Sequence, residues 1–270
     1  MHLMEVLGYF LAMVIGVTLG LFGAGGSILT LPVLYYVFGV EAELGTAYSL
    51  FIVGTTALAG AIPNMKRKTI NYKAAIVFSI PSLSAVYRTR AYLLNLIPDN
   101  LGTIGSRAID KNLALLILFS IIMILAAISM IRNRKTPERS EGVDERYNYP
   151  MIFTEGAVVG VVTGLVGAGG GFLIIPALVL FAKLPMRIAV GTSLLIIAIK
   201  SLVGFLGDVQ SGQPLEWGFL AIFTSLTIAG ILLGGYLSKF LPAQKLKGAF
   251  GWFVLAMGLL ILFEELILHI

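Results

Sequence analysis

Long apolar runs alternate with short polar loops along the whole chain. A helix that spans a bilayer needs about 20 mostly apolar residues, and most of the runs approach that length. The runs at 26–38 and 171–182 are the exceptions, and the 13 residues of the first extend only about 20 Å at about 1.5 Å per residue. The pattern predicts an all-α integral membrane protein. Its runs lie at 5–22, 26–38, 44–62, 74–97 and 112–131, and then at 151–168, 171–182, 188–207, 218–240 and 248–268.

A glycine cluster precedes each of the two short runs. Gly23-Ala24-Gly25-Gly26 opens the first, and Gly167-Ala168-Gly169-Gly170 opens the second. Each glycine disfavours a helix by roughly 1 kcal/mol relative to alanine. In lipid, broken backbone survives only where it is buried in protein or lines a polar cavity. The clusters therefore predict broken or re-entrant helices at an internal site.

The second half of the chain repeats the first. Chance similarity between apolar segments would not keep glycines and prolines in phase over some 80 residues. We therefore predict two repeats of about five apolar segments each, at 1–131 and 151–270, joined by a cytoplasmic linker at 132–150. Adding 144 to the number aligns Gly16 with Gly160, Gly20 with Gly164, Gly23 with Gly167, Gly26 with Gly170, Pro32 with Pro176, Ser49 with Ser193 and Pro98 with Pro242.

Loop charges predict how the repeats cross the membrane. Loops rich in lysine and arginine usually face the cytoplasm. Five segments per repeat, an odd number, would then give the repeats opposite orientations, as in many secondary transporters with a site near the midplane. Both termini would face outward. If the short runs do not cross, they form re-entrant hairpins, and the inversion depends on how far the preceding runs extend. The basic loops are 63–73, 132–150, 183–187 and 239–247, and the acidic ones are 39–45 and 208–216.

Composition agrees with a multi-pass protein, which we expect in the cytoplasmic membrane with its first run retained. Only 12% of residues are charged and 58% are hydrophobic, with a mean hydropathy of +0.95, whereas soluble domains are about 25% charged. There are no cysteines, and the two histidines lie near the chain ends. We expect no metal, no cofactor and no enzymatic activity, since no Walker A, zinc, G-x-S-x-G or Ser–His–Asp pattern occurs. No basic tract with interleaved aromatics indicates nucleic-acid binding.

The glycine clusters are the first candidate site. A helix that begins near Gly26 or Gly170 presents unpaired N–H groups and a positive dipole end, and glycine lets the backbone approach a bound anion. The alternative is that the glycines only permit close helix packing, which is our interpretation of Gly16 and Gly20. The predicted anion site comprises Gly23, Gly25, Gly26, Gly167, Gly169 and Gly170.

Hydroxyl and cationic side chains are further candidates. Ser49, Thr192 and Ser193 could donate hydrogen bonds to an oxyanion, or could instead bond to their own helices. Lys200 lies well inside an apolar run, where an ionisable group is functional by default, unless it snorkels to the surface. Arg88 and Arg90 could attract an anion on the outer side, or pair with Asp99 or Glu43. The basic loops themselves are better explained by topology than by binding.

The residues resemble one known family. Gly16-x-x-x-Gly20-x-x-Gly23-Ala24-Gly25-Gly26, followed by a short apolar stretch through Pro32, is similar to the TauE/SafE sulfite exporter family. Gly160 to Pro176, followed by Gly191-Thr192-Ser193-Leu194, resembles it more closely. The resemblance implies a membrane permease for small sulfur-containing anions such as sulfite or organosulfonates. The chain departs from it at Ala47-Tyr48-Ser49, and at Arg88 and Arg90, where repeat two has Leu232 and Gly234.

We therefore predict a secondary transporter of a small anion that works by alternating access between the two repeats. An inside-negative potential is worth about 2.3 kcal/mol per charge per 100 mV and drives anions outward, so export needs no coupled ion. Uptake would need a proton or sodium ion, for which Glu155, Glu264 and Glu265 are the candidate carboxylates. The alternatives are a membrane assembly or binding protein that does not transport, and a channel or permease for another anion. The partners expected are the anion and the bilayer, and the chain is compatible with a homodimer.

Overall fold

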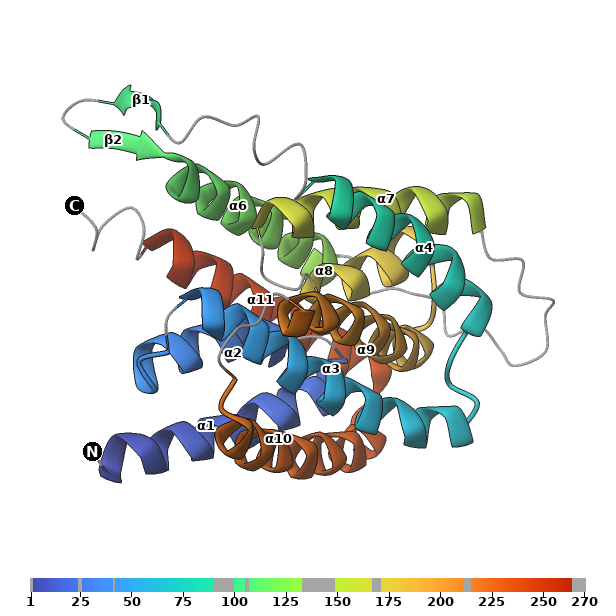
Figure 1. Ribbon diagram of the computed structural model, residues 1–270. Helices are drawn as coiled ribbons and strands as arrows, with labels where there is room; N and C mark the ends of the chain where they lie inside the picture. The colour runs from blue at the N-terminus through green and yellow to red at the C-terminus, as the bar shows by residue number, and fades with distance from the viewer. Residues whose placement is uncertain are drawn as a thin grey trace.

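The computed structural model describes residues 2–23, 26–40, 42–89, 100–104, 107–132, 149–166, 171–210 and 215–263. As the apolar runs predict, the protein is an all-α membrane protein (Figure 1). Four helices are long and apolar enough to span a bilayer, at Met4–Phe22, Leu44–Lys66, Met186–Leu206 and Trp217–Phe240.

The first half holds α1 (His2–Phe22), α2 (Gly26–Pro32), η1 (Val33–Val37), α3 (Ala42–Lys66), α4 (Tyr72–Arg88) and α6 (Lys111–Arg132). The second holds α7 (Tyr149–Val166), α8 (Gly171–Pro176), η3 (Ala177–Phe181), α9 (Met186–Gln210), α10 (Trp217–Leu237), η4 (Ser238–Phe240) and α11 (Ala243–Phe263). Each predicted apolar run overlaps one of these helices or a consecutive pair, although residues 90–97 and 264–268 of the predicted runs lie outside the described residues. Most of the predicted linker, residues 133–148, lies outside the described residues.

Two details differ from the pattern. The polar connection between α4 and α6 holds a small antiparallel hairpin of β1 (Asn100–Ile104) and β2 (Arg107–Asp110). Helix α3 also continues past Pro63, where its apolar run ends. The Pro63 carbonyl accepts a hydrogen bond from the Arg67 N–H at 3.1 Å. The proline lies in the last turn of α3, where its missing N–H removes one hydrogen bond near the end of the helix.

The helices pair between the two halves. Helix α1 lies along α10, and α4 lies along α7, while α3 packs against α9 and α6 against α11 (Figure 1). Adding 144 to the residue number maps α1 onto α7 and α4 onto α10. The pair of α1 with α10 is therefore equivalent to the pair of α7 with α4. The offset also maps α3 onto α9, while α6 and α11 are the last helices of their halves. This pairing is the one expected of two halves related by a two-fold axis, and the repeat itself stays a prediction.

Reciprocal contacts between α3 and α9 have the same form. A methyl group added to Gly60 would lie 3.3 Å from the Leu194 side chain, and one added to Gly204 would lie 3.3 Å from that of Leu50. Both residues of the first pair map onto the second by the offset of 144. The two helices run antiparallel, since Gly54 faces Leu202 while Gly60 faces Leu194. An inverted repeat requires this arrangement, although the side of the membrane that each half faces stays a prediction.

The two short helices also end in the same way, with a matching hydrogen bond at equivalent positions. Pro32 and Pro176 each precede one turn of π-helix, η1 and η3. The Val40 N–H then donates to the Leu34 carbonyl at 3.0 Å, and the Leu184 N–H donates to the Leu178 carbonyl at 2.9 Å. Gly39 (φ 66°) and its equivalent Lys183 (φ 56°) both have left-handed backbone there. The repeat therefore reaches the level of helix caps.

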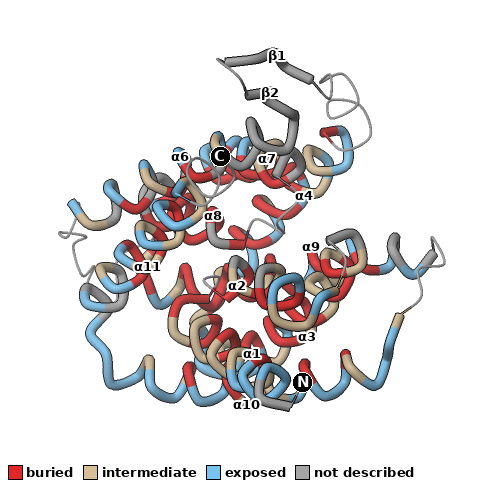
Figure 2. The backbone as a smooth tube through the Cα atoms, turned by 90° about the vertical axis from the view of Figure 1, so that its left-hand side faces the viewer, coloured by how far each residue is buried: buried red, intermediate tan, exposed pale blue. Residues whose placement is uncertain are grey.

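Burial fits a bilayer environment. Buried residues gather in the middle of the molecule and exposed ones face outward (Figure 2). In the central helix α9, 67% of the apolar stretch that could span the membrane is buried, against 39% in α1 and in α10. Large apolar side chains on the outer faces, such as Phe10, Ile222 and Leu233, are exposed. In water this surface would be costly, whereas lipid solvates it.

Close packing of α1 on α10 predicts a contrast between two neighbouring glycines. A methyl group at Gly234 would meet the Val17 carbonyl of α1, whereas one at Gly235 would meet no atom within 4 Å. We expect Gly234→Ala to destabilise the protein by about 1–3 kcal/mol through overpacking, and Gly235→Ala to leave its stability unchanged or slightly raised. Thermal unfolding of the purified proteins in detergent measures both. Equal unfolding temperatures for the two variants would contradict the tight α1–α10 contact.

Candidate functional site

The first glycine break lies directly against α9. Gly23 has φ +76°, a left-handed conformation that favours glycine. A methyl group there would lie 2.7 Å from the Ser193 Oγ and 3.0 Å from the Val190 backbone. The Ser193 hydroxyl lies 3.4 Å from the Gly23 carbonyl and 2.9 Å from the Val190 carbonyl, to both of which it can donate. Two predicted site residues, 170 positions apart, are thus brought together.

The helix that follows this break folds back beside α1. A methyl group at Gly26 would meet the Ile15 carbonyl and would lie 2.6 Å from the Leu19 side chain. Helix α2 and η1 then return to Gly39 along α1. This is the hairpin geometry expected if the short run does not cross the membrane. The close approach also gives Gly26 a packing role, whatever else the break does.

The two short helices begin beside each other. Ser27, in the first turn of α2, is buried, and its Oγ would lie 2.9 Å from a methyl group built on Gly171, the first residue of α8. The same methyl group would lie 2.9 Å from the Ile197 side chain of α9. Ser27 and Gly171 occupy equivalent positions in the two predicted repeats, so the starts of the two short helices adjoin at matching residues.

Thr192 is fully buried and engaged with α4. Its Oγ1 accepts a hydrogen bond from the Asn71 N–H at 3.0 Å, at the point where α4 begins. Tyr48 occupies the equivalent position on α3, and its hydroxyl accepts one from the Glu216 N–H at 2.8 Å, where α10 begins. Threonine and tyrosine therefore perform the same capping role in the two repeats. Thr192 has a structural function whether or not it also contacts a ligand.

Lys200 is buried, not snorkelled. Its exposed fraction is 8%, and its Nζ donates to the Thr163 Oγ1 of α7 at 2.7 Å. Its equivalent, Thr56, instead bonds to Thr227 of α10 at 2.7 Å. Lys200 lies seven residues beyond Ser193 on α9, about 10 Å along the helix axis. The structure therefore holds an ionisable amine in the interior of the second half, where the first half has a threonine.

The remaining predicted residues are more scattered. Ser49 is half-buried on α3. Arg88 is exposed at the last turn of α4, about 25 Å along that helix from the Thr192 contact. Gly25, Gly167, Gly169, Gly170 and Arg90 lie outside the described residues. In the described part of the chain, no group of three His, Cys, Asp or Glu side chains could hold a metal ion.

Sequence reasoning missed three polar residues at this centre. Ser27 directly follows the first glycine cluster, so its place at the start of a helix could have been recognised. Asn71 is an N-cap, with its Oδ1 accepting from the Ala74 N–H at 2.9 Å, and its sequence position before an apolar run is the usual signal. Thr163 lies on an apolar helix, and nothing in the sequence distinguishes it from a threonine that bonds to its own helix.

Glu155 is a buried carboxyl on α7, with 9% of its surface exposed. Neither of its oxygens has a hydrogen-bond partner among the described residues. Ser79 and Ser82, on the buried face of the neighbouring helix α4, also have unpaired hydroxyls there. An intramembrane acid of this kind is costly to retain and usually functional.

The chain is similar to known membrane proteins over most of its length. A family model described as sulfite exporter TauE/SafE matches residues 9–261. A probable membrane transporter protein of Xylella fastidiosa (strain Temecula1) is 30% identical over 93% of this chain and 92% of its own length. One of Methanocaldococcus jannaschii is 32% identical over 80% and 78%, and YunE of Bacillus subtilis is 27% identical over 84% of each chain. The similarity therefore extends over both repeats.

The two equivalent hydroxyl caps predict matched losses of stability. Thr192→Val removes the acceptor of the Asn71 N–H, and Tyr48→Phe removes that of the Glu216 N–H, with little change of shape. We expect each to lower the free energy of unfolding by about 1 kcal/mol. Ser84→Ala is the control, because its exposed hydroxyl bonds only within its own helix, to the Ile80 carbonyl. Unfolding temperatures of both variants equal to that of the control would refute the capping role.

Proposed function

The chain belongs to the sulfite exporter TauE/SafE family of membrane transporters, and we propose that it exports a small sulfur-containing anion, such as sulfite or an organosulfonate. The protein is a multi-pass membrane transporter. Its substrate and direction are the proposed part. The family description supports the sulfur anion, and the membrane potential, which drives anions outward, supports export.

The observation that carries this proposal is that the two short helices, each preceded by a glycine cluster in the sequence, begin side by side against α9. A broken helix inside a membrane protein leaves N–H groups and a positive dipole end that suit an anion. Ser27 and Gly171 adjoin, and Gly23 contacts Ser193. The proposed binding place lies between these breaks, with Ser193 as a hydroxyl donor and Lys200 as the nearby buried charge. Transport would then be a rocking of one repeat against the other around this place.

A packing-only role for the glycines is the competing explanation, in which the protein binds or assembles without transport. Two glycines with left-handed backbone, Gly23 and Gly39, distinguish the transport proposal from the packing-only explanation. Gly23→Ala strains the backbone and displaces Ser193, whereas Gly39→Ala strains a backbone whose added methyl group would meet nothing within 4 Å. The equivalent of Gly39, Lys183, already carries a side chain at φ 56°.

We expect Gly23→Ala to reduce sulfite flux by about tenfold or more, since left-handed strain of about 1–2 kcal/mol adds to a steric clash at Ser193. Gly39→Ala should retain flux within about twofold, because its strain is remote from the proposed site. The measurement is flux of radiolabelled sulfite in proteoliposomes under an imposed potential. Absence of flux of any sulfur oxyanion in the folded wild-type protein would sink the transport proposal.

Glu155 favours a second candidate, proton-coupled movement of the anion. An inward-moving anion opposes the membrane potential and needs a compensating cation, and a buried carboxyl without a partner can carry a proton. The charged residues known on the facing helix α4 are Lys73, whose Nζ lies 4.2 Å over the Tyr149 ring, and Arg88 at its other end. Between Lys73 and Arg88, the buried hydroxyls of Ser79 and Ser82 have no hydrogen-bond partner among the described residues.

Substitution of Glu155 distinguishes the two modes. If transport is proton-coupled, Glu155→Gln should abolish the response of flux to an imposed pH gradient while anion exchange at equal concentrations continues. If export is driven by the potential alone, the variant should match the wild type in both assays. Glu216→Gln is the control, because Glu216 is exposed and its side chain makes no capping bond.

A further inference from the structure

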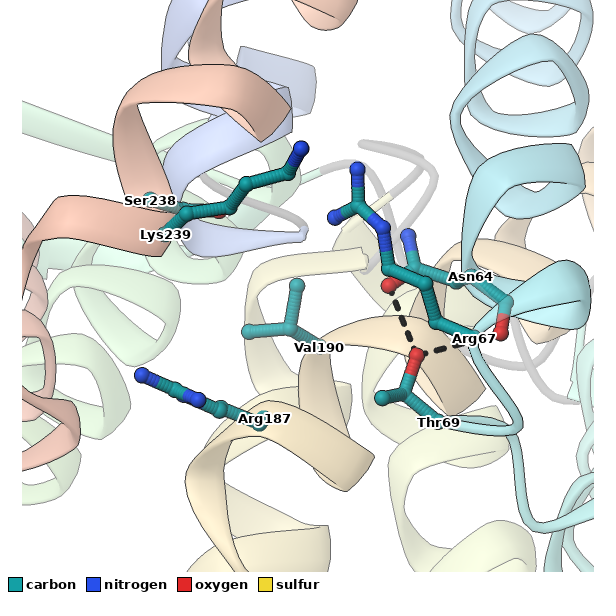
Figure 3. A pocket seen from close by; sticks show the side chains of 7 residues that line it. All are labelled: Asn64, Arg67, Thr69, Arg187, Val190, Ser238 and Lys239. Atoms are coloured by element: carbon teal, nitrogen blue, oxygen red, sulfur yellow. Dashed lines mark hydrogen bonds between the residues drawn. The ribbon is translucent and has the colours of Figure 1, made fainter.

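Three basic loops that are far apart in the sequence converge on one cleft. The cleft has a volume of about 180 Å³ and lies between the ends of α3 and α10 and the start of α9 (Figure 3). Arg67 comes from the loop after α3, Arg187 from the first turn of α9 and Lys239 from the turn after α10. The complete lining is Asn64, Arg67, Thr69, Arg187, Val190, Ser238 and Lys239.

The three cations face the cleft without acidic partners. No carboxylate lines it, and none of the three forms a salt bridge within the described residues. In Figure 3 the Arg67 guanidinium and the Lys239 ammonium extend toward each other across the opening. Like charges repel at close range, so this arrangement has an electrostatic cost that a bound anion would relieve. Their combined field also concentrates anions at the opening.

The position of Arg67 is fixed by a well-bonded turn. Lys68 has φ 56°, and the Thr69 N–H donates to the Asn64 carbonyl at 3.0 Å. The Thr69 hydroxyl lies 2.9 Å from the Asn64 Oδ1 and 3.1 Å from the Asn64 carbonyl oxygen, as Figure 3 shows. The Asn64 side chain in turn donates to the Gly60 carbonyl at 2.8 Å. Part of the cost of ordering Arg67 is therefore met before any ligand arrives.

The floor of the cleft reaches the first glycine break. Val190 lines the cleft, and its backbone would lie 3.0 Å from a methyl group on Gly23. The Val190 carbonyl also accepts the hydrogen bond of Ser193. A second cleft of about 190 Å³ shares Asn64, Arg67 and Lys239 and extends past Gly20 and Leu194. Val190 therefore lies between the basic opening and the proposed anion site.

We propose that this basic cleft binds a small soluble oxyanion and is the docking site from which the transported anion reaches Gly23 and Ser193. This role rests on the proposed function, whereas the binding of an oxyanion does not. Arginine presents a planar fork of donors that matches an oxyanion, and lysine adds a mobile point charge. The volume of about 180 Å³ is large enough for a small oxyanion together with water. The phosphate of an anionic lipid shares this chemistry and is a competing occupant.

The same three loops supply a matched control. The test variant is Arg67→Gln/Arg187→Gln/Lys239→Gln, and the control is Lys66→Gln/Lys183→Gln/Lys245→Gln. Lys66, Lys183 and Lys245 are exposed and do not line the cleft. Both triple variants remove three positive charges from the same three regions, so they change the net charge and the overall field alike. Only the test variant removes side chains that line the cleft.

Sulfite binding to the purified full-length protein in detergent is measured first, by calorimetry at low and at high salt. We expect the test variant to bind about tenfold or more weakly, because charge-assisted hydrogen bonds are lost. The control should bind like the wild type, and wild-type binding should weaken as salt rises. Equal affinities for the two triple variants would overturn the site. So would a test variant that loses copurified phosphatidylglycerol, measured by mass spectrometry, while its sulfite binding is unchanged.

Flux in proteoliposomes then tests the docking role separately. We expect the test variant to require about tenfold more sulfite for half-maximal flux from the face that carries the cleft, with a similar maximal rate. Half-saturation equal to that of the control would overturn docking while leaving transport established. If the wild type binds sulfite through the three cations but transports none, the proposed function and the docking role fail, and the binding site stands.

Discussion

Every backbone N–H and carbonyl inside a bilayer needs a partner, and the rest of this structure depends on how the protein meets that demand at two broken helices. Water is absent there, so a break must be buried against protein or serve a polar site. The structure uses α9 for this purpose. Ser193 contacts the break at Gly23, and Ile197 contacts Gly171 one turn further along. This explains why α9 is the most buried of the long apolar helices.

The long apolar runs were sufficient to locate the helices, because a membrane helix is recognised from its length and apolar composition. The repeat offset was equally informative: Ser27 and Gly171 are equivalent and adjacent, as residues near a two-fold axis must be. What the sequence could not provide were contacts between distant segments. The bond between Asn71 and Thr192 depends on how α4 meets α9, and the hairpin at 100–110 lies in a polar stretch without strong alternation. The charges of the basic cleft were visible, but their convergence was not.

The two halves share a scaffold and differ in chemistry. Thr192 and Tyr48 cap equivalent helices with different side chains, so this substitution preserves the fold. Lys200 and Thr56 are different, because one is charged and the other is neutral while both bond to a threonine. The proposed alternating access needs inward-facing and outward-facing states of similar energy, which a symmetric scaffold favours. Side chains that differ between the repeats would change how each state binds the anion, whereas the driving gradient sets the net direction of transport.

The cations lie mostly at the ends of helices because burying a charge in the membrane is costly. A cation at the membrane centre is expensive, and in the described part of the chain Lys200 is the only lysine or arginine that is buried. The three cations of the basic cleft lie at helix ends instead, where water still reaches them. In the proposed mechanism, the solvated cations attract the anion over a distance, and neutral N–H and hydroxyl groups at the breaks make the close contacts. Neutral donors hold an anion less tightly than a buried ion pair would, and a transporter must release what it binds.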